Sequence, residues 1–183
     1  MAASAAIIRK AGTGKEFVIS RLLDAPRDLV WTAWTQGERL AQWWGPKGCK
    51  IRVVKLEMRP GGIFHYAMVF PEPQPRLNGL SEVWGRFIWR EIVAPERIVF
   101  VNSFSDANGG VTRAPFAETW PLEVLSTVTL SEKAGKTELT IRVHPINGTA
   151  QENEAFAGMH ESLQQGYGGT FDQLAAYLAT AKA

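Results

Sequence analysis

Four side chains along the chain have the chemistry to orient a ligand or to move a proton, namely His65, Glu82, Arg86 and His160. A neutral imidazole can bind a ligand oxygen or act as a general base. Alternation along a strand places Glu82, Trp84 and Arg86 on one face, where the two charges could form a buried pair that binds a polar ligand end. The same pattern fits simpler interpretations, which we favour: His65 faces solvent, His160 lies on a helix flank, and the two charges lie on the surface.

Other kinds of chemistry have little support in the sequence. The three histidines, at positions 65, 144 and 160, share no metal-ligand spacing, and no His-x-x-x-His or Cys-x-x-Cys pair occurs. The single cysteine, Cys49, lies in a predicted strand without a neighbouring histidine, and the sequence has no Gly-x-Ser-x-Gly elbow. No Gly-x-Gly-x-x-Gly turn joins a predicted strand to a helix, as a dinucleotide site requires. We therefore expect no metal, no cofactor and no nucleophilic catalysis.

Aromatic side chains are a stronger signal. Four tryptophans, Trp31, Trp34, Trp43 and Trp44, fall within fourteen residues. Large rigid indoles form a nearly fixed wall, which either packs in a core or lines a cavity. Core filling is the simpler interpretation for each residue alone, because protein interiors are close-packed, whereas large planar groups near glycines leave gaps. The residues predicted to line a cavity are Trp34, Trp43, Phe64, Tyr66, Trp84, Phe87, Met159, Leu163 and Tyr167.

The composition is that of an ordinary globular protein. The chain has 183 residues, of which 45% are hydrophobic and 21% charged, and its formal net charge is +2. So small an excess of positive charge, without a local basic patch, argues against nucleic-acid binding. No stretch reaches the roughly 18 apolar residues of a membrane span, and one cysteine permits no internal disulfide. We expect a cytoplasmic protein with a flexible tail over residues 1–14 and one domain over residues 15–183.

Hydrophobic periodicity predicts the elements that must position these residues. A short strand is expected at Ile7-Ile8, and a β-rich run predicts a strand over residues 16–23. Asp24 followed by Pro26 predicts the start of a helix, with Asp24 as its N-cap. A second short helix begins near residue 37, and Gly45-Pro46 ends it.

The remainder of the chain alternates as strands do and then turns helical. Strands are expected over residues 49–58, 63–70, 80–93, 97–104, 122–132 and 136–144, with loops at 71–75 and 105–121. An apolar stripe from residue 149 onward predicts one helix of about 30 residues, about 45 Å long. The predicted fold is α+β, in which a curved antiparallel sheet wraps around the long C-terminal helix and two short helices follow the first strand.

Several short motifs resemble those of one superfamily. They are Asp24-Ala25-Pro26 before Val30-Trp31, Trp43-Trp44-Gly45-Pro46, Arg59-Pro60-Gly61-Gly62, Gly135-Lys136-Thr137 and Gln165-Gly166-Tyr167. On these residues the chain resembles the START-like (SRPBCC) superfamily over residues 16–178, and within it the activator of heat-shock-protein-90 ATPase homologues. The resemblance implies the helix-grip (START-like, Bet v-like) fold. It says little about activity, because the superfamily hosts lipid carriers, hormone receptors, polyketide cyclases and co-chaperone domains.

Three functions remain open from the sequence. The leading hypothesis is binding of a small hydrophobic or amphipathic molecule in an aromatic-lined internal cavity between the sheet and the long helix. An enzyme resembling polyketide cyclases and dehydratases would instead need His65, Glu82 or Tyr167 to move protons at one void. A protein-interaction module would expose an apolar patch around residues 104–120, where Phe116 and Trp120 lie, for a chaperone partner. The same loop could equally serve as a homodimer surface or as a lid.

Overall fold

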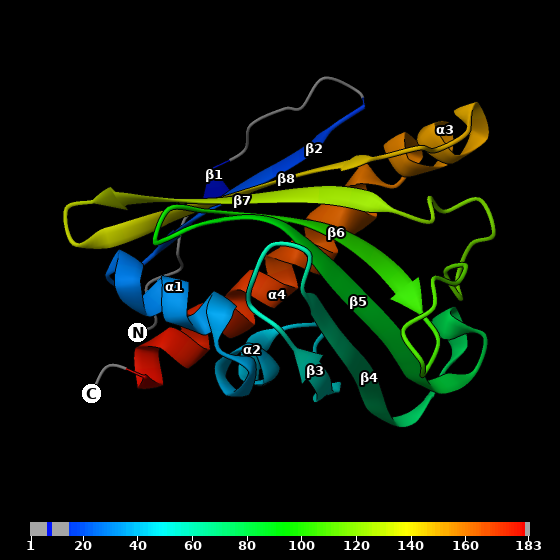
Figure 1. Ribbon diagram of the computed structural model, residues 1–183, viewed down its shortest axis with the longest axis horizontal. Helices are drawn as coiled ribbons and strands as arrows, with labels where there is room; N and C mark the ends of the chain where they lie inside the picture. The colour runs from blue at the N-terminus through cyan, green and yellow to red at the C-terminus, as the bar shows by residue number, and fades with distance from the viewer. Residues whose placement is uncertain (1–6, 9–14, 182–183) are drawn as a thin grey trace.

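One antiparallel sheet dominates the structure (Figure 1). The computed structural model describes residues 7–8 and 15–181 of the chain. Within these ranges the sheet has eight strands in the order β1-β2-β8-β7-β6-β5-β4-β3. The strands are β1 (Ile7–Ile8), β2 (Phe17–Leu23), β3 (Lys50–Leu56), β4 (Ile63–Gln74), β5 (Leu80–Val93), β6 (Arg97–Ser105), β7 (Val124–Lys133) and β8 (Lys136–Pro145). All neighbours pair antiparallel, and β2 pairs with β8 although most of the chain lies between them.

Every predicted strand is present, including the two-residue strand at Ile7–Ile8. The other residues of the predicted N-terminal tail, 1–6 and 9–14, lie outside the described residues. One loop prediction is wrong. β4 continues through the proline-rich segment to Gln74, which pairs with Leu80, and a short 3₁₀ turn, η1 (Pro75–Leu77), follows. Prolines are tolerated there because the pairing with β5 is irregular between Val69 and Gln74.

Two short helices close one end of the sheet. They are α1 (Arg27–Thr35) and α2 (Gly37–Trp43), and both contact the C-terminal helix. The prediction that Asp24 caps the first helix is wrong, because Pro26 occupies the N-cap position in an extended conformation and makes no side-chain cap bond. Its fixed φ suits a residue that enters a helix and needs no N–H there. α2 ends at Trp43, immediately before Trp44 and the Gly45-Pro46 pair, as expected.

The C-terminal segment differs from the single helix that we expected. It forms α3 (Ala150–Gly158) and α4 (His160–Thr180), and the chain changes direction at Met159, whose φ and ψ are −100° and 10°. Thr149 and Glu152 form a capping box that fixes the start of α3. Gly158 is a weak helix former at the position where the helix stops. α4 therefore has 21 residues and spans about 32 Å rather than 45 Å.

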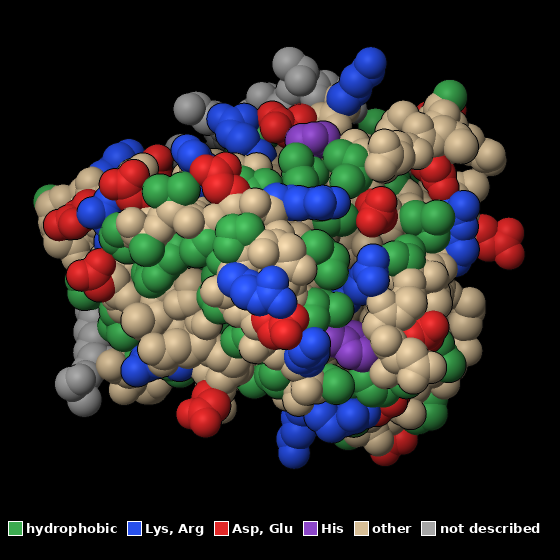
Figure 2. Space-filling view, viewed as in Figure 1, with side chains coloured by type: hydrophobic (Ala, Val, Ile, Leu, Met, Phe, Trp, Pro, Cys, Tyr) green, Lys and Arg blue, Asp and Glu red, His purple; other side chains and the backbone are tan. Residues whose placement is uncertain are grey.

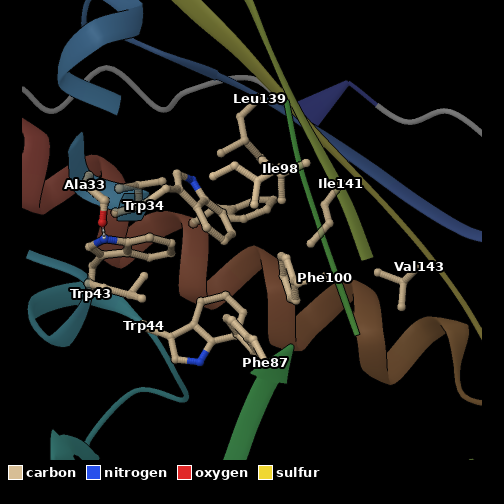
Figure 3. Packing of buried hydrophobic residues seen from close by; sticks show 14 of the residues in the cluster. Ala33, Trp34, Trp43, Trp44, Phe87, Ile98, Phe100, Leu139, Ile141 and Val143 are labelled. Carbon is tan, nitrogen blue, oxygen red and sulfur yellow. Dashed lines mark hydrogen bonds between the residues drawn. The ribbon is translucent and has the colours of Figure 1, made fainter. Parts of the chain in front are cut away.

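α4 crosses the concave face of the sheet, with α1 and α2 beside its C-terminal half (Figure 1). Large buried side chains fill the space at that end (Figure 3). Trp34 and Trp43 pack edge to face, with ring centroids 4.8 Å apart, and the Trp43 indole donates a 3.0 Å hydrogen bond to the Ala33 carbonyl. Phe171 and Leu174 of α4 are fully buried in the same cluster. The predicted α+β helix-grip fold is confirmed.

Charged side chains of both signs are mixed on the face of the molecule seen in Figure 2, where they are interspersed among polar and apolar ones. Ion pairs such as Arg52 with Glu82 and Arg142 with Glu16 account for part of this mixing. No helix among the described residues is long and apolar enough to cross a membrane.

Candidate ligand-binding cavity

A partly open cavity of about 320 Å³ lies between the sheet and the N-terminal half of α4. This volume falls at the lower end of the range for small-molecule sites. The lining comes from β4, β6, β7, β8 and α4, from the segment after α2, from Met159 before α4 and from the loop between β6 and β7. The lining residues are Trp44, Gly45, Pro46, Tyr66, Met68, Asn102, Ser103, Phe104, Phe116, Trp120, Val124, Val143, Met159, Ser162, Leu163, Gly166, Tyr167 and Thr170.

Six of the eighteen lining residues are aromatic. Trp44, directly after α2, packs edge to face on Phe87, with ring centroids 5.1 Å apart (Figure 3). At the mouth, Phe116 contacts Phe104 and Trp120, each with ring centroids 5.6 Å apart. Phe116 is 38% exposed, whereas Trp120 is only 8% exposed. The rim can therefore meet an entering molecule while the wall behind it is held in place.

Side-chain size along α4 explains why this end is hollow. Towards its C-terminus the helix presents Phe171, Leu174 and Leu178 to the core, and all three are buried. Towards its N-terminus, Ser162, Gly166 and Thr170 face the cavity beside the larger Leu163 and Tyr167. A Cβ added at Gly166 would meet no heavy atom within 4 Å. The small residues leave space that the sheet does not fill.

Two phenols border the cavity, and both keep their protons at neutral pH. Burial strongly raises the pKa of the Tyr66 phenol, against a smaller lowering effect of the Trp44 side chain. Burial raises the pKa of Tyr167 to about 12, against a smaller lowering effect of the Ser126 hydroxyl. Gly85, opposite Tyr66 on β5, makes room for this ring: a Cβ there would lie 2.6 Å from the Tyr66 hydroxyl. Each phenol can therefore donate a hydrogen bond, but neither can serve as a base.

The other polar side chains in the lining differ in whether they have partners. The Thr170 hydroxyl is hydrogen-bonded to the carbonyls of Gly45, at 3.2 Å, and Gly166, at 3.1 Å. The half-buried Asn102 side chain has no hydrogen-bond partner among the described residues. No Asp, Glu, His, Lys or Arg belongs to the lining within residues 15–181. The cavity is thus apolar and uncharged, with a small set of neutral polar groups.

The structure brings four of the predicted lining residues together and separates the others. Tyr66, Met159, Leu163 and Tyr167 do line the cavity. The expectation is not met for Trp34, Trp43, Phe64 and Phe87, which are at most 1% exposed and fill the core beside the cavity. They pack against one another because α1 and α2 close that end of the sheet, so the simpler interpretation of core filling holds for them.

Trp84, Glu82 and Arg86 share the outer face of the sheet, so none of them reaches the cavity. Their neighbours Gly85 and Phe87 take the inner face, as strand alternation requires. Glu82 pairs with Arg52 at 2.6 Å rather than with Arg86. Arg86 donates a 2.7 Å hydrogen bond to the Gly109 carbonyl in the loop after β6. The predicted buried pair of Glu82 and Arg86 does not form.

Neither histidine reaches the cavity. His65 points to the outer face, yet it is 5% exposed because the loop after β6 covers it. Its Nε2 donates a 3.1 Å hydrogen bond to the Asp106 carbonyl, and its ring stacks on Trp84 at 5.2 Å. His160 lies at the start of α4 between the rings of Phe17 and Phe156, at 5.7 Å and 5.4 Å. Both imidazoles are therefore packed within the structure and away from the hollow.

Sequence reasoning missed Asn102, Phe104 and Trp44 as lining residues. Asn102 had a readable signal, because residues 98, 100, 102 and 104 share one face of a strand and the other three are Ile98, Phe100 and Phe104. A lone amide in an inward-facing apolar row marks a polar group aimed at the interior. Among the described residues, no group of three or more His, Cys, Asp or Glu side chains is arranged to hold a metal ion.

A curved antiparallel sheet, a helix across its concave face and a hollow between them define a helix-grip domain. The model of the "Activator of Hsp90 ATPase homolog 1-like protein" family matches residues 24–179, and the chain belongs to this family. The family resemblance drawn from the sequence motifs is thus confirmed. No curated protein matches the chain significantly.

Solved structures share the fold at low sequence identity. A protein from Arthrobacter aurescens has a TM-score of 0.74 and 22% identity, over 97% of this chain and 92% of that one. Protein Ms6760 from Mycobacterium smegmatis has a TM-score of 0.73 and 20% identity, over 94% and 97% of the two chains. DynU16, a protein in the dynemicin biosynthetic locus, has a TM-score of 0.61 and 21% identity, over 92% of this chain and 48% of that one. At these identities the likeness concerns the fold alone.

Proposed function

We propose that the protein binds a small hydrophobic or amphipathic molecule in the cavity between the sheet and α4. One observation carries the proposal: the aromatic-walled hollow of about 320 Å³ lacks any charged side chain among its described lining residues. Apolar ligand surface buried there contributes about 25 cal/mol per Å² to binding. The cavity wall is held by packed rings, so little conformational entropy is lost when a ligand enters.

Acid–base catalysis of the cyclase or dehydratase kind is less well supported. It needs at least two titratable groups at one void, yet His65 and Glu82 lie on the opposite face of the sheet. Of the three residues suggested for proton transfer, Tyr167 alone borders the cavity. Its pKa of about 12 makes it a weak acid and leaves almost no phenolate to act as a base near neutral pH.

A chaperone-binding or homodimer surface is also less well supported. The patch suggested around Phe116 and Trp120 is the rim of the cavity, and Trp120 is almost entirely buried. The exposed Phe116 ring is therefore explained by access to the hollow, without a protein partner. A cytoplasmic location fits this function, in which a soluble binding protein needs neither a disulfide nor a membrane span.

The test is a ligand screen with a variant that fills the cavity. Fatty acids, sterols, flavonoids and polyketide-like aromatics are screened by thermal shift and tryptophan fluorescence against the wild type, Gly166→Leu and Ala176→Leu. Gly166 lines the cavity and has open space around its Cβ position, whereas Ala176 lies on the same helix outside the lining; both positions are exposed. We expect at least one compound to stabilise the wild type and A176L and to lose at least tenfold in affinity for G166L.

Two results would count against the proposal. In the first, no compound stabilises the wild type. In the second, a compound binds G166L and the wild type equally well, which would place its site elsewhere on the molecule.

A further inference from the structure

We propose that Asn102 determines the specificity of the cavity and selects an uncharged ligand whose carbonyl or amide group hydrogen-bonds to its side chain. The inference rests on the proposed function and adds the chemical class of the ligand. It assigns the apolar body of the ligand to the aromatic wall and its polar end to the sheet side of the hollow.

The position of Asn102 follows from the register of the sheet. It lies opposite Phe87 on one neighbouring strand and opposite Val124 on the other. Opposite residues of antiparallel strands share a face, and Phe87 belongs to the core while Val124 lines the cavity. The Asn102 side chain therefore points into the hollow from the middle of the sheet, where the local row is otherwise apolar.

Asn102 is the lining side chain best suited to recognise a polar group of a ligand by hydrogen bonding. An amide offers two donors and an acceptor, and in this structure none of them is used by a described residue. The Thr170 hydroxyl, by contrast, is already engaged with two backbone carbonyls. A ligand that hydrogen-bonds to this half-buried amide replaces its hydration, whereas a ligand that covers it with hydrocarbon leaves its donors and acceptor unsatisfied at a cost in affinity.

The lack of charged side chains in the described lining predicts an uncharged ligand. An anion buried in the cavity would lose its water without meeting a cation, because no Lys, Arg or His belongs to the described lining. The same environment already disfavours a negative charge on its own phenols, since burial raises the pKa of both Tyr66 and Tyr167. A carboxylate of the same shape should therefore bind less tightly than the amide.

The test compares four bicyclic compounds that share one apolar body: naphthalene, 2-naphthamide, 2-naphthol and 2-naphthoate. Dissociation constants are measured by equilibrium dialysis at pH 7.5 with the wild type, Asn102→Leu and Asn108→Leu. Asn108 is an exposed loop residue outside the lining, so its variant makes the same chemical change away from the cavity. We expect 2-naphthamide to bind the wild type about tenfold more tightly than naphthalene and than 2-naphthoate.

N102L should remove the advantage of 2-naphthamide over naphthalene while naphthalene still binds, and N108L should keep that advantage. Retained naphthalene binding shows that N102L is folded. If N102L does not fold, Asn102→Ala replaces it in the same comparison. The inference is overturned if 2-naphthoate binds the wild type most tightly, or if the amide advantage persists in N102L. If no compound of this series or of the wider screen binds, the proposed function itself is overturned. This result differs from the two above, in which a ligand binds but Asn102 does not select it.

Discussion

The two ends of the space between sheet and helix contain similar aromatic residues in different states of packing. At the closed end, Trp34, Trp43 and Phe100 are at most 1% exposed, and Trp34 packs against both of the others. At the open end, Trp44 and Trp120 border a hollow. Aromatic content alone therefore does not distinguish a core from a cavity. What distinguishes them is that α4 presents large buried side chains to the closed end, whereas at the open end the small Ser162, Gly166 and Thr170 lie among its larger ones.

The difference also has a functional meaning. A filled end stabilises the fold, and close packing there leaves little freedom for change. A hollow end forgoes part of the dispersion and hydrophobic energy that the same rings could provide. In a ligand-binding protein, this lost stability is what a preformed cavity costs. Substitutions at the closed end should therefore mainly lower the free energy of unfolding, and substitutions at the open end should mainly lower ligand affinity.

The largest expected effect comes from truncating one ring at each end. Trp43→Ala should lower the free energy of unfolding by about 3–5 kcal/mol, because a fully buried ring and its hydrogen bond to Ala33 are lost. Trp120→Ala should cost only about 1–2 kcal/mol, because part of its ring already faces a void. Urea unfolding followed by circular dichroism measures both values.

Ligand affinity should respond in the reverse order. W120A should weaken binding of any compound found in the screen, whereas W43A, measured well below its melting temperature, should retain most of it. Equal destabilisation by the two substitutions would mean that the open end is packed as densely as the closed one, and the comparison between the ends would be wrong.

The free energy of unfolding should fall at alkaline pH because the phenols at the open end are buried. The folded-state pKa of Tyr167, about 12, lies above the unfolded value of about 10. The stabilising contribution is therefore complete below pH 10 and is lost as the pH rises from 10 to 12, because the unfolded chain releases the proton first. The loss from this residue amounts to about 2–3 kcal/mol, and Tyr66 acts in the same direction.

Denaturant unfolding at several pH values between 8 and 11.5 tests this dependence. Tyr167→Phe has no proton to release, so its stability should decline less steeply above pH 10 than that of the wild type. Identical slopes in the two proteins would show that the Tyr167 phenol is not withdrawn from water.

The pattern of strands could be predicted from the sequence because each one alternates or is bounded by turn residues. The 80–93 strand, for example, has the predicted bounds. Alternation alone, however, does not say which face is inner, and Trp84 was assigned to the wrong one. In the structure, Gly85 shows which face of β5 is the inner one, because a side chain at this position would collide with Tyr66. Local periodicity cannot report a contact between two strands whose register is unknown.

The location of the hollow was beyond sequence reasoning for a related reason. Met159, Leu163 and Tyr167 could be predicted because a helix laid across the sheet turns its apolar stripe inward, and Tyr66 is an aromatic residue of strand β4. The four rings that fill the core are Trp and Phe, as are the lining residues Trp44 and Phe104, and their packing depends on where α1 and α2 lie. The break between α3 and α4 at Met159 also depends on how the segment after β8 packs on the sheet. The apolar periodicity of the sequence carries no information on that packing.

The loop at the mouth of the cavity should loosen when one ion pair is removed. Arg113 donates hydrogen bonds to the Glu152 carboxylate and, at 3.3 Å, to the Trp120 carbonyl, so it ties the loop to the start of α3. The Arg113 guanidinium and the Thr149 backbone N–H lower the pKa of Glu152. This contribution to stability is present above the ordinary glutamate pKa and is lost as the pH falls through the lowered value.

Glu152→Gln keeps an oxygen for the capping box but removes the charge that holds Arg113. We expect amide hydrogen exchange over residues 113–120 to become several-fold faster, with little change in the core strands. Dissociation of a bound ligand should accelerate by a similar factor. Unchanged exchange in this segment would show that Arg113 and Glu152 do not control the mouth.

The smallest expected effect is a gain in stability at the open end. Gly166→Ala should raise the free energy of unfolding by about 0.5–1 kcal/mol, because alanine is the better helix former and its Cβ enters empty space. Gly169→Ala makes the same change on the same helix outside the lining, so the two variants should gain similar stability, a rise of about 1–4 °C in melting temperature. Their effects should separate only in binding, since the added methyl of G166A narrows the hollow. A loss of stability in G166A alone would mean that the space beside Gly166 is already occupied, and the contrast between a filled and a hollow end would fail at the residue on which it depends most.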